Sequence, residues 1–143
     1  MQTRPAFPCL PRRWCAALLA AAATSLALDA AAQTVRCHIG WAGAVRTFTI
    51  TPAPADETPP PLLEGASLAV EVINRLPPAP GAGVTVRTLG HWQGQAYLLH
   101  EAHYLPTQPA VGPHGFTGLQ TVREPTRGHL LSYWCEHAAA APR

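Results

Sequence analysis

Two histidines and a glutamate stand close together in the segment His100-Glu101-Ala102-His103. The zinc-protease helix motif needs two histidines four positions apart, with a glutamate directly after the first. Here the second histidine is three positions on, and Tyr104 stands where the motif requires it. On a strand, residues three apart face opposite sides, so these two imidazoles could not share a metal ion. We therefore predict ordinary strand histidines and no zinc-protease centre.

Residues that could act as nucleophiles lack the surroundings that activate them. Ser67 and Ser132 stand in apolar segments without the Gly-x-Ser-x-Gly turn of the hydrolases. Cys37 is adjacent to a histidine, but a sulfur bound in a disulfide is not a nucleophile. The paired acids Asp56-Glu57 lie in a proline-rich loop, where solvation explains them. The sequence therefore predicts no catalytic residue and a protein that is not an enzyme.

Residues 1–32 have the features of a secretory signal peptide. Three arginines precede an apolar or small stretch at 15–28, and Ala30-Ala31-Ala32 forms a processing site before Gln33. At 1.5 Å per residue that stretch spans about 21 Å, less than the roughly 30 Å of a hydrocarbon core, which argues against an uncleaved anchor. We expect a periplasmic or secreted chain of residues 33–143 that begins within a residue or two of Gln33. Arg12-Arg13 leaves the twin-arginine route open beside the general one.

The cysteines indicate a single disulfide. Cys9 and Cys15 leave with the signal peptide, so the mature chain keeps Cys37 and Cys135. In an oxidising compartment two remaining cysteines most simply pair with each other. Closing a loop of about 100 residues stabilises a fold by roughly 4–5 kcal/mol in the chain-entropy account. Two separate buried thiols are the alternative.

The charges of the mature chain exclude some partners. Residues 33–143 hold seven Arg against seven Asp plus Glu, with no Lys, and the basic residues are scattered. A nucleic-acid or anionic-lipid surface needs a basic stripe, and none is present. We expect no nucleic-acid partner and no stable membrane insertion after processing.

The periodicity of the mature chain predicts strands joined by proline-rich and glycine-bounded links. Apolar residues alternate along most segments, and 13 of the 111 mature residues are proline, nearly all in the links. Residues 95–105 fit both a strand and a short helix, and their neighbours favour a strand. The fold class is therefore all-β, a sandwich or partly open barrel in one domain, residues 33–143. The seven expected strands are 34–39, 44–51, 67–74, 84–89, 95–105, 119–123 and 129–135.

Strand direction sorts the histidines into two groups. If seven strands alternate, the first and last run the same way and both cysteines fall at one end of the domain. Four imidazoles at that end suit copper or zinc, whereas solvated surface histidines are the alternative. The four are His38, His103, His114 and His137, with His91 and His129 at the opposite end. No cofactor is required by any motif.

Trp41 and Trp92 each occupy a short glycine-bounded link. Exposed aromatic residues at loop tips often bind glycans or partner proteins. The alternative is that each indole folds back and caps the core. Strict alternation of seven strands places the two links at opposite ends, which predicts separate sites.

Three short motifs carry a resemblance to known proteins. Residues Cys37-His38-Ile39-Gly40-Trp41, residues 131–135 (LSYWC) and Thr117-Gly118 resemble a group of small exported proteobacterial proteins of unassigned function. The resemblance implies export and paired cysteines, and it implies no activity or ligand. We expect an exported, non-catalytic binding or accessory protein of the bacterial envelope, with an envelope protein or glycan as partner. Metal binding by the histidine-rich end and inhibition of an envelope hydrolase are the alternatives.

Overall fold

The computed structural model describes residues 34–139. The expected signal peptide, residues 1–32, and its processing site lie outside the described residues. Within residues 34–139 no helix is long and apolar enough to cross a membrane. The described residues form an all-β fold, as the alternation of apolar residues predicted.

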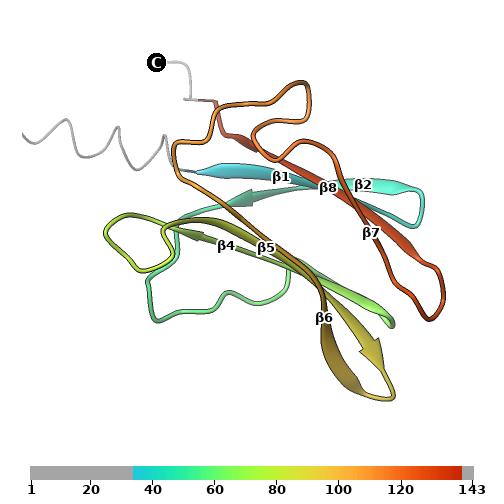
Figure 1. Ribbon diagram of the computed structural model, residues 1–143. Coiled ribbons are helices and arrows are strands. Elements are labelled where there is room, and N and C mark those ends of the chain that lie inside the picture. The colour runs from blue at the N-terminus through green and yellow to red at the C-terminus, as the bar shows by residue number, and fades with distance from the viewer. Residues whose placement is uncertain (1–33, 140–143) are drawn as a thin grey trace, which may run out of the picture. The chain divides into compact units, whose positions relative to one another are not determined.

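Within the described range eight strands form two four-stranded antiparallel sheets, which lie face to face as the layers of a sandwich (Figure 1). One sheet has the order β2-β1-β8-β7 and the other β3-β4-β5-β6. The strand bounds are β1 Val35–Trp41, β2 Ala44–Ile50, β3 Leu63–Glu64, β4 Leu68–Arg75, β5 Gly83–Trp92, β6 Gln95–Tyr104, β7 Gln120–Arg123 and β8 Leu130–His137. All strands except β3 correspond to predicted ones, and the segment that fitted both periods is a strand.

The strand that sequence reasoning missed, β3, has only two residues. Three prolines at 59–61 precede it, and proline cannot donate to a ladder, so pairing begins where the Leu62 N–H donates to the Val70 carbonyl (2.8 Å). The Gly65 N–H then donates to the Leu68 carbonyl (2.8 Å) as the chain turns into β4. In the predicted alternation of seven strands β3 was absent. Counting it reverses the expected direction of every later strand relative to β1.

Cys37 and Cys135 form the predicted disulfide. The two residues are directly opposite each other in the register of β1 and β8, and both side chains are fully buried. The first and last strands are therefore neighbours. The prediction that the first and last strands run in the same direction is wrong, because β1 and β8 are antiparallel. The missed strand β3 accounts for the difference.

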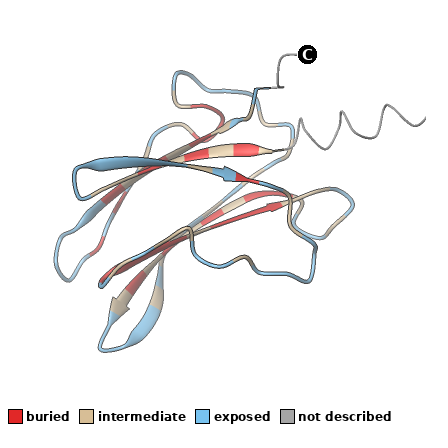
Figure 2. Ribbon diagram, turned by 180° about the vertical axis from the view of Figure 1, so that it is seen from behind, coloured by how far each residue is buried: buried red, intermediate tan, exposed pale blue. Residues whose placement is uncertain are grey.

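The core fills the space between the two inner faces. Along β1 the residues Val35, Cys37 and Ile39 are buried in alternation, as the sequence predicted. Buried residues recur along the strands of both sheets (Figure 2), and those of the core form one hydrophobic cluster. The edge strand β2 is mostly exposed, since the short β3 covers little of it.

Two hairpins close with two-residue turns. Ala42 and Gly43 have φ angles of 52° and 80°, and Gln93 and Gly94 have φ angles of 51° and 77°. Positive φ at both central residues defines the type I′ turn, whose twist matches that of the flanking strands. Both hairpins therefore present the residue before the turn, Trp41 or Trp92, at a fixed position.

The turns that follow β1, β3, β5 and β7 lie at one end of the sandwich, on the right of Figure 1. We call this end, made of residues 42–43, 65–67, 93–94 and 124–129, the turn end. The links that leave β2, β4 and β6 start at the opposite end, the loop end. The predicted separation of Trp41 from Trp92 is therefore wrong: β3 restores the direction that brings both tryptophans to the turn end.

Candidate functional site

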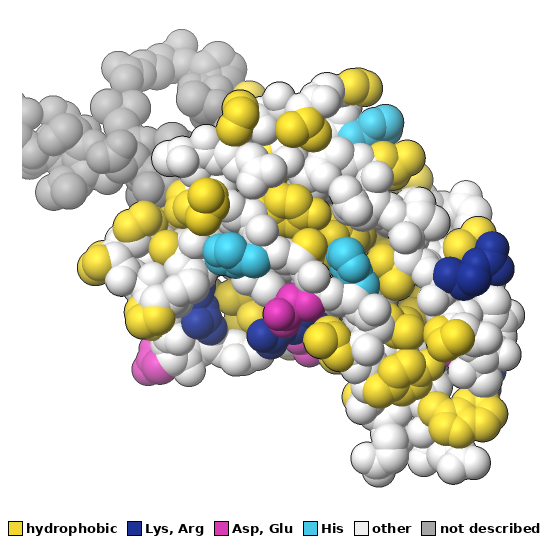
Figure 3. All heavy atoms as spheres, in the orientation of Figure 1, with side chains coloured by type: hydrophobic (Ala, Val, Ile, Leu, Met, Phe, Trp, Pro, Cys, Tyr) yellow, Lys and Arg dark blue, Asp and Glu magenta, His cyan; other side chains and the backbone are white. Residues whose placement is uncertain are grey.

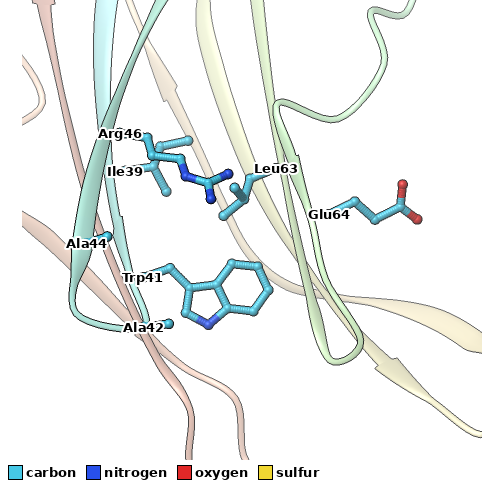
Figure 4. Close-up of a pocket in the computed structure, with 7 residues that line it drawn as sticks. All are labelled: Ile39, Trp41, Ala42, Ala44, Arg46, Leu63 and Glu64. Atoms are coloured by element: carbon cyan, nitrogen blue, oxygen red, sulfur yellow. The ribbon is translucent and has the colours of Figure 1, made fainter.

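Trp41 is the last residue of β1, and its indole enters the space between the sheets (Figure 4). It packs against the core and closely against Gly65, where an added Cβ would lie 2.1 Å from the indole Cη2 atom. Only glycine fits at position 65 without moving the ring. The capping role that was the alternative for Trp41 is thus the one the structure describes.

A hollow of about 380 Å³ lies beside this indole, between β2 and β3 (Figure 4). We call it the Arg46 slot. The guanidinium of Arg46 points across it toward Leu63, while the carboxylate of Glu64 points away. Among the described residues Arg46 has no ion-pair partner. The slot is lined by Ile39, Trp41, Ala42, Ala44, Arg46, Leu63 and Glu64.

A second hollow, of about 570 Å³, lies beside Trp92 at the tip of the β5–β6 hairpin. Trp92 is 49% exposed, and Arg127, from the link between β7 and β8, lines the same hollow. The His91 Nδ1 atom is buried without a hydrogen-bond partner among the described residues. This hollow combines an open aromatic face, a cation and the glycines Gly65 and Gly94.

A third hollow, of about 320 Å³, joins these two regions. It shares Trp41 and Ala42 with the Arg46 slot, and it shares Ala66 and Arg127 with the hollow beside Trp92. The turn end therefore presents adjoining hollows with two tryptophans and two arginines. The two tryptophans predicted to bind a partner belong to one surface.

The turn end is held rigid by the buried carboxylate of Glu124, which is 0% exposed. Its Oε1 accepts hydrogen bonds from the Thr126 N–H (2.8 Å) and the Tyr97 hydroxyl (3.1 Å), and its Oε2 accepts one from the Arg127 N–H (2.5 Å). Burial raises the pKa of this carboxyl, but the hydrogen bonds outweigh burial and lower the pKa of Glu124 to about 2. Because Tyr97 belongs to β6, this carboxylate ties the link after β7 to the other sheet.

A second hydrogen bond joins the sheets at the same end. Ser67 Oγ lies 2.8 Å from His129 Nδ1. Ser67 stands before β4, and His129 stands before β8. Ser67 is buried, so this bond fixes the segment before β4 against the segment before β8.

His38 and His114 contact the same ring, the indole of Trp134. His38 stacks on it with centroids 4.7 Å apart, and His114 meets it edge-on at 5.2 Å. His38 lies on the outer face of its sheet, because its register partner Trp134 alternates with the buried Tyr133 and Cys135. The structure therefore brings together two of the four histidines expected at one end.

The other two histidines, His103 and His137, contact different residues. His137 stacks on Phe116 at 4.6 Å, and His103 Nδ1 lies 3.0 Å from Thr85 Oγ1 on the outer face of the other sheet. In residues 34–139 no three His, Cys, Asp or Glu side chains form a group that could hold a metal ion. The four histidines His38, His103, His114 and His137 thus do not converge on one point.

His100 and His103 face different surroundings, as the three-residue spacing predicted. The His100 Nε2 atom lies 2.8 Å from the Tyr133 hydroxyl between the sheets, whereas His103 contacts the outer face. The Tyr104 hydroxyl is 3.3 Å from that of Tyr133. Burial and the bond with Tyr104 raise the pKa of Tyr133 well above its usual range.

One arrangement on the outer face of β1 has the order of a catalytic triad. His38 Nδ1 lies 2.9 Å from the Thr47 hydroxyl, and its Nε2 lies 3.2 Å from Glu136 Oε1. The same Glu136 oxygen pairs with Arg36 at 3.2 Å, which neutralises it. None of these residues lines the three hollows described at the turn end.

Sequence reasoning did not single out Arg46, Glu64 or Arg127. A signal for Arg46 was present, since Ala44, Arg46 and Phe48 alternate and an arginine on the apolar side of a strand is unusual. Glu64 and Arg127 stand in a two-residue strand and a turn, where no periodicity exists to read.

Comparisons with known proteins identify no family for this chain. No protein-family model, no curated protein and no solved structure matches the chain. The function is therefore inferred from the residues of the turn end.

Proposed function

We propose that this chain is an exported, non-catalytic binding protein of the bacterial envelope that engages a partner protein through its turn end. The observation that carries the proposal is the half-exposed Trp92 beside adjoining hollows on a rigid surface. Tryptophan and arginine are the residues most often found at the energetic centre of protein interfaces. Trp92 and Arg127 supply both types in one hollow.

Export is supported by two independent features. The first 32 residues have the composition of a signal peptide, and the buried Cys37–Cys135 disulfide is typical of proteins that fold in an oxidising compartment. Periplasmic or secreted location is therefore part of the proposal.

The geometry of the β5–β6 hairpin favours a binding role. Its last pairs, His91 with Ala96 and Trp92 with Gln95, extend past the start of β4. Hydrophobic side chains are visible over this hairpin at the lower right of Figure 3, while charged side chains of both signs are few on that face. A rigid hairpin with an aromatic residue before its turn loses little conformational entropy when it binds.

The same projecting hairpin supports a second candidate, an inhibitor of an envelope hydrolase. A preorganised two-residue turn can enter an enzyme cleft without rearrangement. The copper or zinc alternative has no comparable observation in its favour, since His38 and His103 lie on the outer faces of different sheets.

Affinity capture tests the proposal. Wild-type protein, Trp92→Ala and Leu105→Ala are immobilised and exposed to envelope extract. Leu105 is the matched control, because it is 61% exposed but lies at the loop end. We expect a retained species that survives Leu105→Ala and is lost with Trp92→Ala.

Treatment of the extract shows whether the retained species is a protein or a glycan. Prior protease digestion should abolish capture, whereas capture that survives protease and is lost after periodate oxidation would replace the partner protein by a glycan. Inhibition of a captured hydrolase by added protein would support the second candidate. Equal retention by all three proteins would contradict a binding role for Trp92.

A further inference from the structure

The Arg46 slot has a composition that selects its ligand. Arg46 is directly opposite Ile39 in the β1–β2 register, and Ile39 is buried, so the arginine lies on the inner face of its sheet. Its guanidinium points across the slot (Figure 4), and no carboxylate among the described residues pairs with it. The slot therefore holds a cation with open donors beside the apolar side chains of Trp41 and Leu63.

We propose that the Arg46 slot binds a monocarboxylate attached to a flat apolar group. The planar fork of a guanidinium matches the two oxygens of a carboxylate, and an indole offers a surface on which a flat group stacks. The slot volume of about 380 Å³ lies within the ~300–1,000 Å³ of small-molecule sites. This ligand class rests on the proposed function and names what one hollow of the turn end accepts.

Glu64 limits the charge of the ligand. It also lines the slot, although its carboxylate points away from Arg46 in Figure 4. A carboxylate at the rim repels a second negative charge, so a monoanion fits and a phosphate monoester does not. The single guanidinium of Arg46 balances one negative charge, and Glu64 disfavours a second one.

A competing role for Arg46 is protection of a sheet edge. β2 is an edge strand, and inward-pointing charges on such strands prevent pairing with other chains. That role predicts that Arg46→Gln increases self-association and leaves ligand binding unchanged. The slot proposal predicts weaker ligand binding by a protein that remains monomeric.

The test uses 2-naphthoate as the probe and the purified, oxidised protein. Titration followed by two-dimensional ¹H–¹⁵N NMR should give saturable shifts at the Trp41 indole N–H and the Arg46 Nε–H. The dissociation constant should fall in the range of about 0.1–5 mM usual for a ligand of this size. Arg46→Gln should weaken binding at least about tenfold, because it removes a charge-assisted hydrogen-bond pair.

Two controls separate charge from general effects. Arg123→Gln changes an exposed arginine on β7, outside the hollows of the turn end, and should alter the affinity less than about twofold. The neutral 2-naphthamide should bind wild-type protein at least about tenfold more weakly than 2-naphthoate does. An absence of saturable shifts, equal binding of acid and amide, or tighter binding of naphthyl phosphate would overturn the proposal.

A further titration tests whether the carboxylate belongs to the C-terminus of a peptide chain. A short peptide that ends in phenylalanine is compared as the free acid and as the C-terminal amide. Tighter, Arg46-dependent binding of the free-acid peptide than of 2-naphthoate would support the slot chemistry and assign its source to a chain terminus.

Failure of the slot is distinguishable from failure of the proposed function. If 2-naphthoate does not bind while capture still depends on Trp92, the ligand class is wrong and the partner-binding function stands. If 2-naphthoate binds but capture does not depend on Trp92, the ligand class of the slot stands and the partner-binding role of Trp92 is wrong.

Discussion

Reduction of the Cys37–Cys135 disulfide should lower the melting temperature by a large and calculable amount. The cysteines are 98 residues apart, and closing a loop of that length corresponds to about 4.7 kcal/mol in the chain-entropy account, with about 2–5 kcal/mol measured for native bridges. An unfolding entropy of about 2.1 cal/mol/K per residue gives roughly 0.22 kcal/mol/K for a domain of about 100 residues. A loss of about 2–4.7 kcal/mol then lowers the melting temperature by about 9–21 °C.

The fold should nevertheless survive reduction at low temperature. β1 and β8 remain paired from Val35 to Trp41, opposite residues 131–137, and domains of this size have about 5–15 kcal/mol of net stability. Both cysteines are fully buried, so the protein is reduced in denaturant and refolded with a phosphine reductant. Circular dichroism then follows melting, and thiol titration counts free cysteines before and after reduction.

A double variant provides the control for this experiment. Cys37→Ala with Cys135→Ala should melt at the same temperature with and without reductant, because it has no bridge to lose. Two titratable thiols in the untreated protein, or a reduced protein that melts within about 3 °C of the oxidised one, would refute the reasoning.

Four further substitutions test the local structure. Glu124→Gln should lower the melting temperature near pH 6 and flatten its decline in acid. The folded pKa of Glu124 is about 2 and its ordinary value is 4.5, so the stabilisation is present above about pH 4.5 and is lost as the pH falls toward 2; melting curves from pH 6 to 2 measure it. Ala42→Asn and Gln93→Asn should each raise the free energy of unfolding by roughly 0.5–1 kcal/mol, because asparagine adopts the left-handed conformation of type I′ turns more readily; a fall in urea unfolding experiments would contradict this. Tyr133→Phe should reduce stability by about 1–3 kcal/mol, because it leaves His100 Nε2 without its partner; an unchanged urea midpoint would show that this bond contributes nothing.

Most of the fold was predictable because its longer strands carry a two-residue period. The alternation of Val35, Cys37 and Ile39 identified β1, and proline or glycine marked the ends of the segments that became β2 and β4–β8. Cysteine counting identified the bridge without any geometry. These features depend on local sequence, which is where periodicity and turn chemistry act.

The candidate site was less predictable because it depends on direction and register. Trp41 and Trp92 were recognised as turn residues, but their common location follows only from a count of strands that includes β3. Two residues carry no readable period, so Leu63–Glu64 could not be identified as a strand. One missed strand was enough to assign the two tryptophans to opposite ends.

The same local sequence both hides β3 and opens the Arg46 slot. The prolines at 59–61 cannot donate hydrogen bonds to β4, so the ladder starts at Leu62 and the strand is short. A short β3 leaves the inner face of β2 uncovered at the turn end, and Arg46 lies on that face opposite Ile39. The segment at 59–64, which caused the error in the predicted number of strands, is therefore also the one that leaves Arg46 accessible to a ligand.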